Sequence, residues 1–346
     1  MNLVMRAISR ACVYSGFANM CDRKRRSSRK PTVTILAYHR IGCPETERRG
    51  LDSKLLSASP AGFHWQMEYL RSHFEVLSFE DMVDRFRMGQ PLAPNTALVT
   101  FDDGYRDNYD LAYPILHRHD LPATIFLTTG LIGSTRRMWW DELAAIIGTT
   151  EAKRVCVPGL GEIRLETSRD RVRAKEKLRR HFKAISEDER RERLNALISE
   201  LGARMHPEFE ERVHLTWDEV RAMNRNRITF GAHTHSHTIL TRVSEERAEG
   251  EIVNSKRIVE RELGQPVRFF AYPNGRPGDF NVHTRMMLIE HGFEAAVTLV
   301  HGSNSLGNDC ADLFALRRIY VGSDDQAVFV AKVSGALETL AARFQF

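Results

Sequence analysis

Residues 97–105 read Ala-Leu-Val-Thr-Phe-Asp-Asp-Gly-Tyr and combine a strand pattern with a polar turn. The apolar, β-branched first half predicts a buried strand, and the acids and glycine predict the turn that ends it. At a strand end, Gly104 can relax the backbone so that Asp102 and Asp103 face one site. Two carboxylates that lie close together repel each other, so they need a cation or a shared proton. A solvated Asp-Gly turn is the alternative interpretation.

A second polar cluster follows the strand-like run at residues 228–230. Residues 231–237 read Gly-Ala-His-Thr-His-Ser-His, in which His233 and His237 have the spacing of a metal-binding pair. Imidazole ligands suit zinc and related ions. A lone histidine would favour a hydrogen-bonded polar turn instead. Three histidines together with the Asp102-Asp103 pair favour a metal site.

The chain alternates between strand and helix patterns about seven times, which predicts a mostly parallel sheet covered by helices. His39, the Asp102-Asp103 pair, His233 and the turn at residues 272–275 all lie at the C-terminal ends of predicted strands. In a (β/α) barrel these ends form one rim, so residues far apart in the sequence would meet there. At 346 residues, the chain can bury a large core and suits one large α/β domain.

Capping residues predict where one helix begins and where another ends in the second half of the chain. Thr216 and Glu219 are typical of a helix start. A second helix is expected from Ser244 to Leu263, because Gly264 follows it and Pro266 lies just beyond.

The Thr-Phe-Asp-Asp-Gly block at residues 100–104 and the His-Thr-His-Ser-His block at residues 233–237 together resemble the signatures of the polysaccharide deacetylase family. This family is also called the NodB-homology or carbohydrate esterase family 4 group. The resemblance extends over residues 32–322 and implies an α/β fold, a distorted (β/α)7 barrel with a helical insertion. It also implies a metal-dependent hydrolase that removes N-acetyl groups, less often O-acetyl groups, from a cell-surface or lipid-linked glycan.

By position, the resemblance implies that Asp103, His233 and His237 bind a divalent metal ion, with Zn²⁺ expected. Three protein ligands leave one coordination position open for water or the acetyl oxygen, as a catalytic site needs. The resemblance implies Asp102 as the general base that takes the proton of the attacking water. It also implies a backbone N–H near Asn274 as the second donor to the oxyanion.

The sequence departs from the family pattern at several positions. Ala271 stands where an arginine often orients the base, and Asn274 stands where an aromatic residue is common. Arg317 or Arg318 is expected to supply the missing guanidinium, and the sequence does not choose between them. The usual Leu-x-His near the C-terminus is also absent. His235 is expected to be a bystander between the two histidine ligands.

An acid must protonate the leaving amine, and we predict that it is His39. Histidine titrates in the right range, and Tyr38-His39 closes the first predicted strand, residues 32–39. In family members with a rearranged motif order, the acid comes from an N-terminal Tyr-His segment that this pair resembles. His301, in Leu-Val-His at residues 299–301, is the rival acid. The alternative is that His39 only hydrogen-bonds within the rim.

Two other function classes stay open. A catalytically silent member that binds glycan would keep the fold but lose a site group, and here every expected ligand and the base are present. An amidohydrolase that acts on a small cytosolic amide would share all of these residues. Trp139-Trp140 could form a sugar-stacking wall, although buried aromatic residues are the preferred interpretation.

The whole chain has a formal net charge of +5, and residues 1–30 carry eight Lys or Arg and one acid, so this tail has a charge of +7 and the remaining chain about −2. The remaining chain has no net basic character, which argues against a nucleic-acid partner. The residues that share the apolar helical face are Leu3, Val4, Ala7, Ile8, Ala11 and Cys12, and a polybasic run follows at residues 23–30. This combination is typical of peripheral membrane contact. A helix packed on the domain, followed by a disordered linker, is the preferred alternative.

The cysteines and the lengths of the apolar runs indicate in which cellular compartment the chain is expected. Five scattered cysteines form no disulfide framework. No apolar run is long enough for a transmembrane helix, and charged residues interrupt any secretory signal. The sequence therefore predicts a cytoplasmic chain. We expect a basic amphipathic tail at residues 1–31, a deacetylase domain at 32–330 with a helical insertion at about 137–212, and a C-terminal helix at 331–346.

Overall fold

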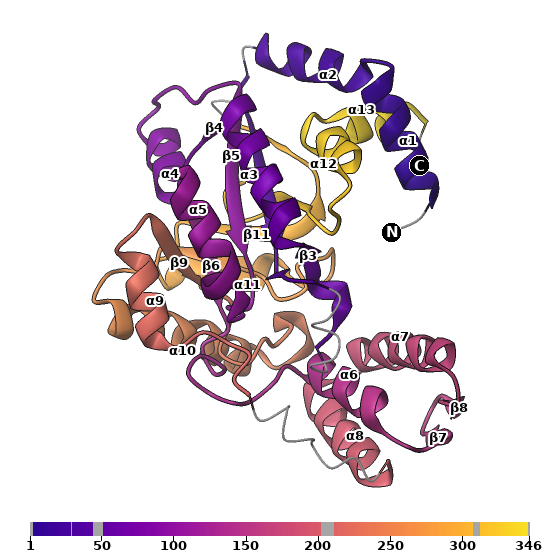
Figure 1. Ribbon diagram of the computed structural model, residues 1–346. Coiled ribbons are helices and arrows are strands. Elements are labelled where there is room, and N and C mark those ends of the chain that lie inside the picture. Colours follow the sequence, from indigo (N-terminus) through magenta and orange to yellow (C-terminus); the bar gives the residue numbers. More distant parts are fainter. Residues whose placement is uncertain (1–2, 29, 44–50, 202–210, 307–311, 345–346) are drawn as a thin grey trace. The chain divides into compact units, whose positions relative to one another are not determined.

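The chain folds into two compact units, both drawn in Figure 1. The computed structural model describes residues 3–28, 30–43, 51–201, 211–306 and 312–344. Unit 1 comprises Met1–Cys43, Leu55–Ile132 and His214–Phe346, and unit 2 comprises Pro44–Lys54 and Gly133–Val213.

Seven parallel strands of unit 1 close into a barrel (Figure 1). Strand β1 (Thr32–Tyr38) closes the ring by pairing with β5 (Asn95–Phe101) along its whole length. The predicted (β/α)7 barrel is thereby confirmed. From β1 to β5 the ring runs through β13 (Leu316–Tyr320), β11 (Ala295–His301), β10 (Phe269–Ala271), β9 (Ile228–Ala232) and β6 (Ala123–Leu127). Two short strands lie outside the ring, β4 (Glu75–Val76) beside β5 and β12 (Asn304–Ser305) antiparallel to β1.

Strand β5 illustrates how the barrel packs. All of its residues except the first are buried, as expected of a parallel strand that is covered on both faces. Successive side chains of a strand point to opposite faces. Val99 therefore belongs to the cluster formed with the surrounding helices, whereas Leu98 belongs to a second cluster with Phe126 and Phe269.

Helices surround the barrel, and capping side chains fix where several of them begin. Ser244 accepts a hydrogen bond from the backbone N–H of Arg247 at the start of α10 (Glu245–Leu263), which ends at the left-handed Gly264. Thr216 and Glu219 form the capping box of α9 (Trp217–Asn224). Both predicted helices are confirmed. The other helices around the barrel are α3 (Pro60–His73), α4 (Phe79–Arg87), α5 (Tyr113–His119), α11 (Val282–Glu290), α12 (Gln326–Val333) and α13 (Ala336–Phe344).

The N-terminal residues form two helices, α1 (Leu3–Tyr14) and α2 (Phe17–Arg26), that pack against α12 and α13. Cys12 and Ala18 are buried in this contact. The expected disordered linker is wrong for residues 23–26, because they form the last turn of α2. Arg25 explains why this turn is ordered: its guanidinium donates to the Val333 carbonyl at 2.7 Å and to Thr34 Oγ1 at 3.2 Å.

Unit 2 has its own apolar core. It contains α6 (Trp139–Thr149), the antiparallel hairpin of β7 (Arg154–Val157) and β8 (Gly161–Arg164), α7 (Ser168–Ala184) and α8 (Glu187–Glu200). This range was expected to be a helical insertion, and the hairpin is an addition to that expectation. Trp140 is only 6% exposed and contacts Trp139 edge-on, which confirms the interpretation as buried aromatics.

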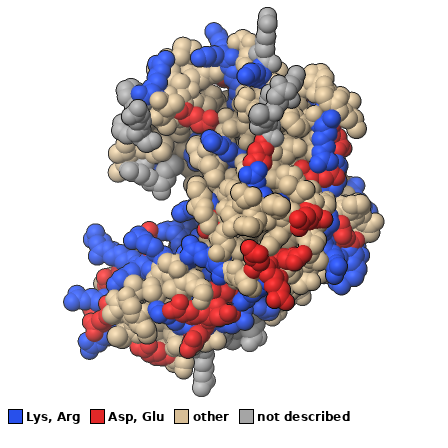
Figure 2. Space-filling view, turned by 180° about the vertical axis from the view of Figure 1, so that it is seen from behind, with Lys and Arg blue, Asp and Glu red and all other residues tan. Residues whose placement is uncertain are grey.

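Lys and Arg side chains gather over the part of unit 2 that contains α7, at the lower left of Figure 2. Some of these cations have structural partners. Arg171 donates hydrogen bonds to the carbonyls of Ile147 and Thr150, at the C-terminus of α6, where positive charge is favourable. Across the residues that the structure describes, no helix is both long and apolar enough to cross a bilayer.

Candidate active site

Three donor groups converge at the rim formed by the C-terminal ends of the barrel strands. Asp103 follows β5, and His233 and His237 follow β9. Asp103 Oδ1 lies 3.6 Å from His233 Nε2 and 3.4 Å from His237 Nε2. One potential ligand atom from each residue lies within 4.8 Å of the other two. The structure therefore brings together the three residues that sequence analysis expected to bind a metal.

These separations fit a single metal ion. Two ligand atoms that bind zinc tetrahedrally at about 2.0–2.1 Å lie about 3.4 Å apart. The distances from Asp103 Oδ1 to the two imidazole nitrogens, 3.4 and 3.6 Å, are close to this value. One carboxylate and two imidazoles are also donor types that zinc takes, and three such ligands leave a fourth position open. The site can hold a divalent ion of this kind.

Several non-glycine residues at the rim have left-handed backbone conformations, which residues with a side chain rarely adopt. Asp103, Thr234 and His237 have positive φ values of 74°, 63° and 60°. Gly104 follows with a φ of 76°, and a Cβ atom at this position would lie 2.8 Å from the Leu127 side chain. Such conformations cluster at functional sites, where the surrounding contacts enforce them. Gly104 thus permits the turn that points Asp103 at the histidines.

A hydrogen bond to a backbone carbonyl orients the ring of His233. Its Nδ1 lies 2.7 Å from the Ala271 carbonyl oxygen, so Nδ1 carries the proton and donates it. Nε2 is then unprotonated and faces Asp103, as a metal ligand must. Burial lowers the pKa of His233, although the nearby Asp102 carboxylate opposes that effect. Ala271, where the family resemblance suggested an arginine, therefore contributes through its carbonyl group.

Asp102 forms a buried ion pair with Arg318 of β13. Arg318 Nη1 and Nη2 donate to the two carboxylate oxygens at 2.7 Å each, and both side chains are at most 1% exposed. The structure thus identifies Arg318, and not Arg317, as the arginine that orients Asp102. Burial is the largest single influence on the pKa of Asp102 and tends to raise it. The charge and hydrogen bonds of Arg318, together with the nearby His233 and His39, outweigh burial, so the net pKa lies below the usual range. Asp102 is therefore an ionised carboxylate at neutral pH.

His39 lies beside Asp102. Its Nε2 is 3.9 Å from Asp102 Oδ2, and its ring packs edge-on against Tyr320. The backbone N–H of His39 donates to Ser57 Oγ at 2.9 Å, which fixes the end of β1. The structure therefore places the predicted acid next to the predicted base.

The His39 segment is held by Asp107 and Asn108, which lie a few residues after the Asp102-Asp103 pair and were not predicted as site residues from the sequence. Asn108 Nδ2 donates to the His39 carbonyl at 2.9 Å. Asp107 accepts from Arg40 Nε at 2.9 Å and from the Ile41 backbone N–H at 3.2 Å. Asn108 begins a π-helical turn, residues 108–112, and such turns are frequent at functional sites. In the sequence, the one indication of a role for Asp107 and Asn108 was their position close to the Asp102-Asp103 pair.

His301 and Asn274 also follow or end barrel strands. Burial lowers the pKa of His301. The charged neighbours that also influence this pKa are Glu338 and Lys332 of the C-terminal helices. Among the described residues, the ion-pair partners of Asp102 are His39 and Arg318, and His301 is not one of them. Asn274 lies in the turn after β10 with a φ of 59°. Its role at the oxyanion stays a prediction.

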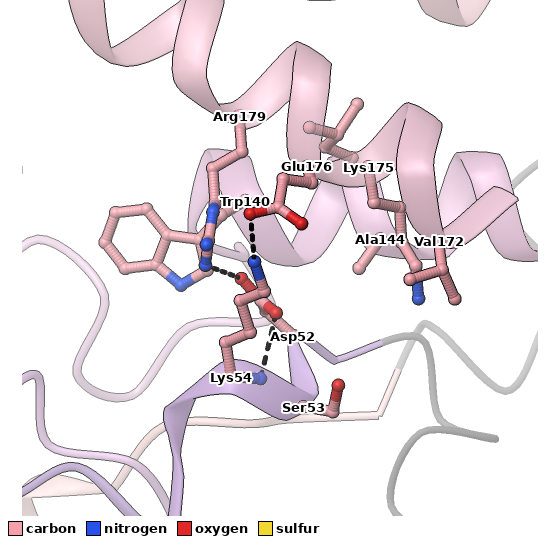
Figure 3. Close-up of a pocket in the computed structure, with 10 residues that line it drawn as sticks. Asp52, Ser53, Lys54, Trp140, Ala144, Val172, Lys175, Glu176 and Arg179 are labelled. Carbon is pink, nitrogen blue, oxygen red and sulfur yellow. Dashed lines mark hydrogen bonds and ion pairs between the residues drawn. The ribbon is translucent and has the colours of Figure 1, made fainter. Parts of the chain in front are cut away.

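Unit 2 contains a separate small pocket of about 110 Å³ between α6, α7 and residues 52–54 (Figure 3). Four of its charged side chains form two pairs: Arg179 with Asp52 at 3.0 Å, and Lys54 with Glu176 at 3.1 Å. The residues that line it include no histidine or cysteine. Among the described residues, Asp103, His233 and His237 at the rim of the barrel form the group of three His, Cys, Asp or Glu side chains whose ligand atoms lie close enough together to hold a metal ion.

Comparisons with known proteins agree with this site. A family model described as polysaccharide deacetylase matches residues 89–164 and 170–296, which include Asp102, Asp103, His233 and His237. The putative polysaccharide deacetylase YxkH of Bacillus subtilis is 20% identical over 290 residues, 84% of this chain and 71% of the relative. The poly-beta-1,6-N-acetyl-D-glucosamine N-deacetylase of Staphylococcus aureus (strain N315) is 30% identical over 115 residues, 33% of this chain and 38% of the relative.

Solved structures show the same fold. The structure of the Streptococcus pyogenes deacetylase PplD in complex with acetate aligns with a TM-score of 0.56 at 21% sequence identity, covering 90% of this chain and 98% of that chain. The structure of IcaB from Ammonifex degensii aligns with a TM-score of 0.55 at 18% identity, covering 88% and 97%.

Proposed function

The chain belongs to the polysaccharide deacetylase family, and we propose that it is a metal-dependent hydrolase that removes N-acetyl groups from a cell-surface or lipid-linked glycan. One observation carries the proposal: Asp103, His233 and His237 converge at ion-binding distances beside an Asp102 carboxylate that Arg318 fixes. The name of the Staphylococcus aureus relative supports an N-acetylated glycan as the substrate class.

Asp103, His233 and His237 would hold the ion, for which Zn²⁺ is the best fit. When bound, the ion would polarise the acetyl carbonyl and lower the pKa of the attacking water. Asp102 would accept the proton of that water. It is ionised at neutral pH and held by two charge-assisted hydrogen bonds, so it is in the basic form at that pH and cannot rotate away.

The leaving amine needs a proton, and His39 would supply it. Its Nε2 lies 3.9 Å from Asp102, so both proton-transfer groups flank the same space. The backbone N–H at Asn274 would donate to the oxyanion, in the turn that the hydrogen bond from Leu299 N to the Gly275 carbonyl fixes.

The alternatives make different predictions for substrates. We expect acetate release from N-acetylated glucosamine oligomers or lipid-linked N-acetyl sugars, measured with metal analysis and after metal removal by a chelator. Turnover restricted to small amides would support the amidohydrolase. Bound metal and bound glycan without acetate release would support the silent member. Acetate release that persists after complete metal removal would contradict the metal-dependent mechanism.

We also propose that the N-terminal helices bring the enzyme to the cytoplasmic surface of an anionic membrane. Helix α1 packs on the domain through Ser9 and Cys12, and this orientation leaves apolar side chains outside. Leu3 and Val4 are 80% and 59% exposed. Nearby basic residues of α1 and α2 would attract anionic lipid head groups.

A further inference from the structure

The loop between the two histidine ligands is bound by one carboxylate from a helix. Glu251 of α10 accepts hydrogen bonds from two consecutive backbone N–H groups, those of His235 and Ser236, both at 2.8 Å through Oε2. Its Oε1 accepts from Ser236 Oγ at 2.5 Å and from Thr238 Oγ1 at 3.3 Å. All four donors belong to residues 235–238, which lie between or beside His233 and His237.

This loop needs external support, because two of its residues are strained. Thr234 and His237 are left-handed, with φ values of 63° and 60°. Non-glycine residues keep such conformations only where surrounding contacts enforce them. An ionised carboxylate forms stronger hydrogen bonds than a neutral acceptor, and it can receive several donors at once. Glu251 is therefore well suited to hold the loop in its strained form.

The opposite side of the loop is also fixed. The backbone N–H of Gly130 donates to the His235 carbonyl at 2.7 Å, and Thr129 Oγ1 lies 3.0 Å from His235 Nδ1. The loop thus lies between the segment after β6 and helix α10. Glu251 has a fixed position because its helix is anchored by the buried residues Ala248 and Ile252 and begins at the N-cap Ser244.

We propose that Glu251 is a positioning residue of the metal centre, which sets the relative positions of the His233 and His237 imidazoles without touching the ion. The inference rests on the proposed function, because it presumes that these imidazoles bind metal. Groups that orient metal ligands in this way change metal affinity when they are removed. The effect of Glu251 is therefore expected in the metal dissociation constant and not only in folding stability.

The test is the substitution Glu251→Gln in the full chain. Glutamine has the same shape, but its amide NH₂ is a donor and would face groups that also donate. Glu260→Gln is the matched control on the same helix, since Glu260 also accepts from a backbone N–H, that of Val267 at 3.0 Å, far along the chain from the histidines. The double variant Ser236→Ala/Thr238→Ala removes the hydroxyl donors and keeps the carboxylate.

The readouts are the Zn²⁺ dissociation constant, measured by competition with a chromophoric chelator, and the unfolding temperature of the metal-free chain. We expect Glu251→Gln to weaken Zn²⁺ binding about 10-fold or more, as removal of such an orienting group typically does. Glu260→Gln should bind Zn²⁺ like the wild type. The double variant should also bind more weakly, and it serves as the test if Glu251→Gln does not fold.

If Glu251→Gln binds Zn²⁺ as tightly as Glu260→Gln and the wild type, the inference is overturned; a lower unfolding temperature of Glu251→Gln would then show that Glu251 only stabilises the fold. That result leaves the metal-dependent function intact, because the wild type still binds Zn²⁺. A wild-type chain that binds no Zn²⁺ would instead overturn the proposed function, and this inference with it.

Discussion

Arg318 and Asp102 connect two strands of the barrel through a fully buried ion pair. Removing one partner of such a pair leaves an uncompensated charge inside the protein, which is strongly destabilising. The same contact orients the proposed base. Function and stability therefore depend on the same two hydrogen bonds at this residue.

Arg318→Lys should separate geometry from charge. Lysine keeps the positive charge but cannot form two parallel hydrogen bonds to one carboxylate. We expect kcat/KM for acetate release to fall about 10-fold or more, since the loss of one well-oriented hydrogen bond is worth at least about 1.4 kcal/mol in the transition state. Arg317→Lys is the control, because Arg317 is the exposed neighbour on the same strand. Similar losses in both variants would contradict the role of Arg318.

His39→Ala should retain bound metal but lose turnover of unactivated acetamides, whose amine must be protonated as it leaves. An activated acetate ester has a leaving group that needs no proton, so its hydrolysis should fall much less. The comparison is the ratio of the two rates in His39→Ala and in His301→Ala. If His301→Ala abolishes amide turnover while His39→Ala retains it, the acid lies late in the chain.

The sequence predicted Asp102, Asp103, His233 and His237 as site residues because they follow strand patterns, and the structure brings Asp103, His233 and His237 together at one rim. It could not choose between Arg317 and Arg318. That choice depends on which face of β13 points into the barrel, and two adjacent arginines give no alternation to read. Glu251 could not be predicted from the sequence, because it lies 15 and 16 residues from Ser236 and His235, to which it hydrogen-bonds, and its sequence position resembles that of any acidic residue in a helix.

At the scale of elements, Arg268 joins three parts of the barrel. It precedes β10 and donates two hydrogen bonds to Glu294, just before β11, each at 2.8 Å. It also pairs with Asp84 of α4. Hydrogen bonds from Arg268 lower the pKa of both Asp84 and Glu294. A carboxylate with a lowered folded-state pKa stabilises the fold above its unfolded pKa, and this stabilisation is lost as the pH falls through the folded value.

Arg268→Met should therefore lower the free energy of unfolding at pH 7 by about 1 kcal/mol, a small value because these side chains are partly exposed. The difference from the wild type should shrink between pH 5 and pH 3, where the carboxylates become protonated. Urea unfolding at pH 7, 5 and 3 measures this. A difference that stays constant with pH would mean that Arg268 acts through packing.

Helices whose ends carry local signals could be predicted, as α9 and α10 were from their capping residues. The hairpin of β7 and β8 could not. Its strands contain only four residues each, and their burial alternates within a strongly charged sequence. A period-two pattern needs more residues than this to stand out from a helical one.

At the scale of the whole molecule, the barrel followed from the repeated alternation of strand and helix patterns. The tail was harder to interpret, because one amphipathic pattern fits both a packed helix and a membrane-bound helix. In the structure α1 packs through Cys12 and still exposes Leu3 and Val4. A packed tail can therefore retain a membrane-binding surface.

The triple variant Leu3→Ser/Val4→Ser/Ile8→Ser tests that surface without removing the packed face. We expect the full-length wild type to sediment with anionic vesicles and to be released by salt, because the attraction is partly electrostatic. The triple variant should bind much less. Val282→Ser/Met286→Ser/Ile289→Ser, which changes three exposed apolar residues of α11, is the control. A chain that begins at Pro31 should lose vesicle binding and keep activity on a soluble substrate. Equal vesicle binding by this shortened chain and by the full-length wild type would rule the membrane contact out.

The central claim is that adjacent acids divide the work, with Asp103 binding the metal and Asp102 acting as the base. Bound metal per chain, measured on purified wild type, Asp103→Asn and Asp102→Asn, tests it most directly. Asp103→Asn should lose the metal because it removes the only charged ligand, whereas Asp102→Asn should retain the metal while losing most acetate release. If Asp102→Asn loses the metal and Asp103→Asn retains it, the division of roles described here is contradicted.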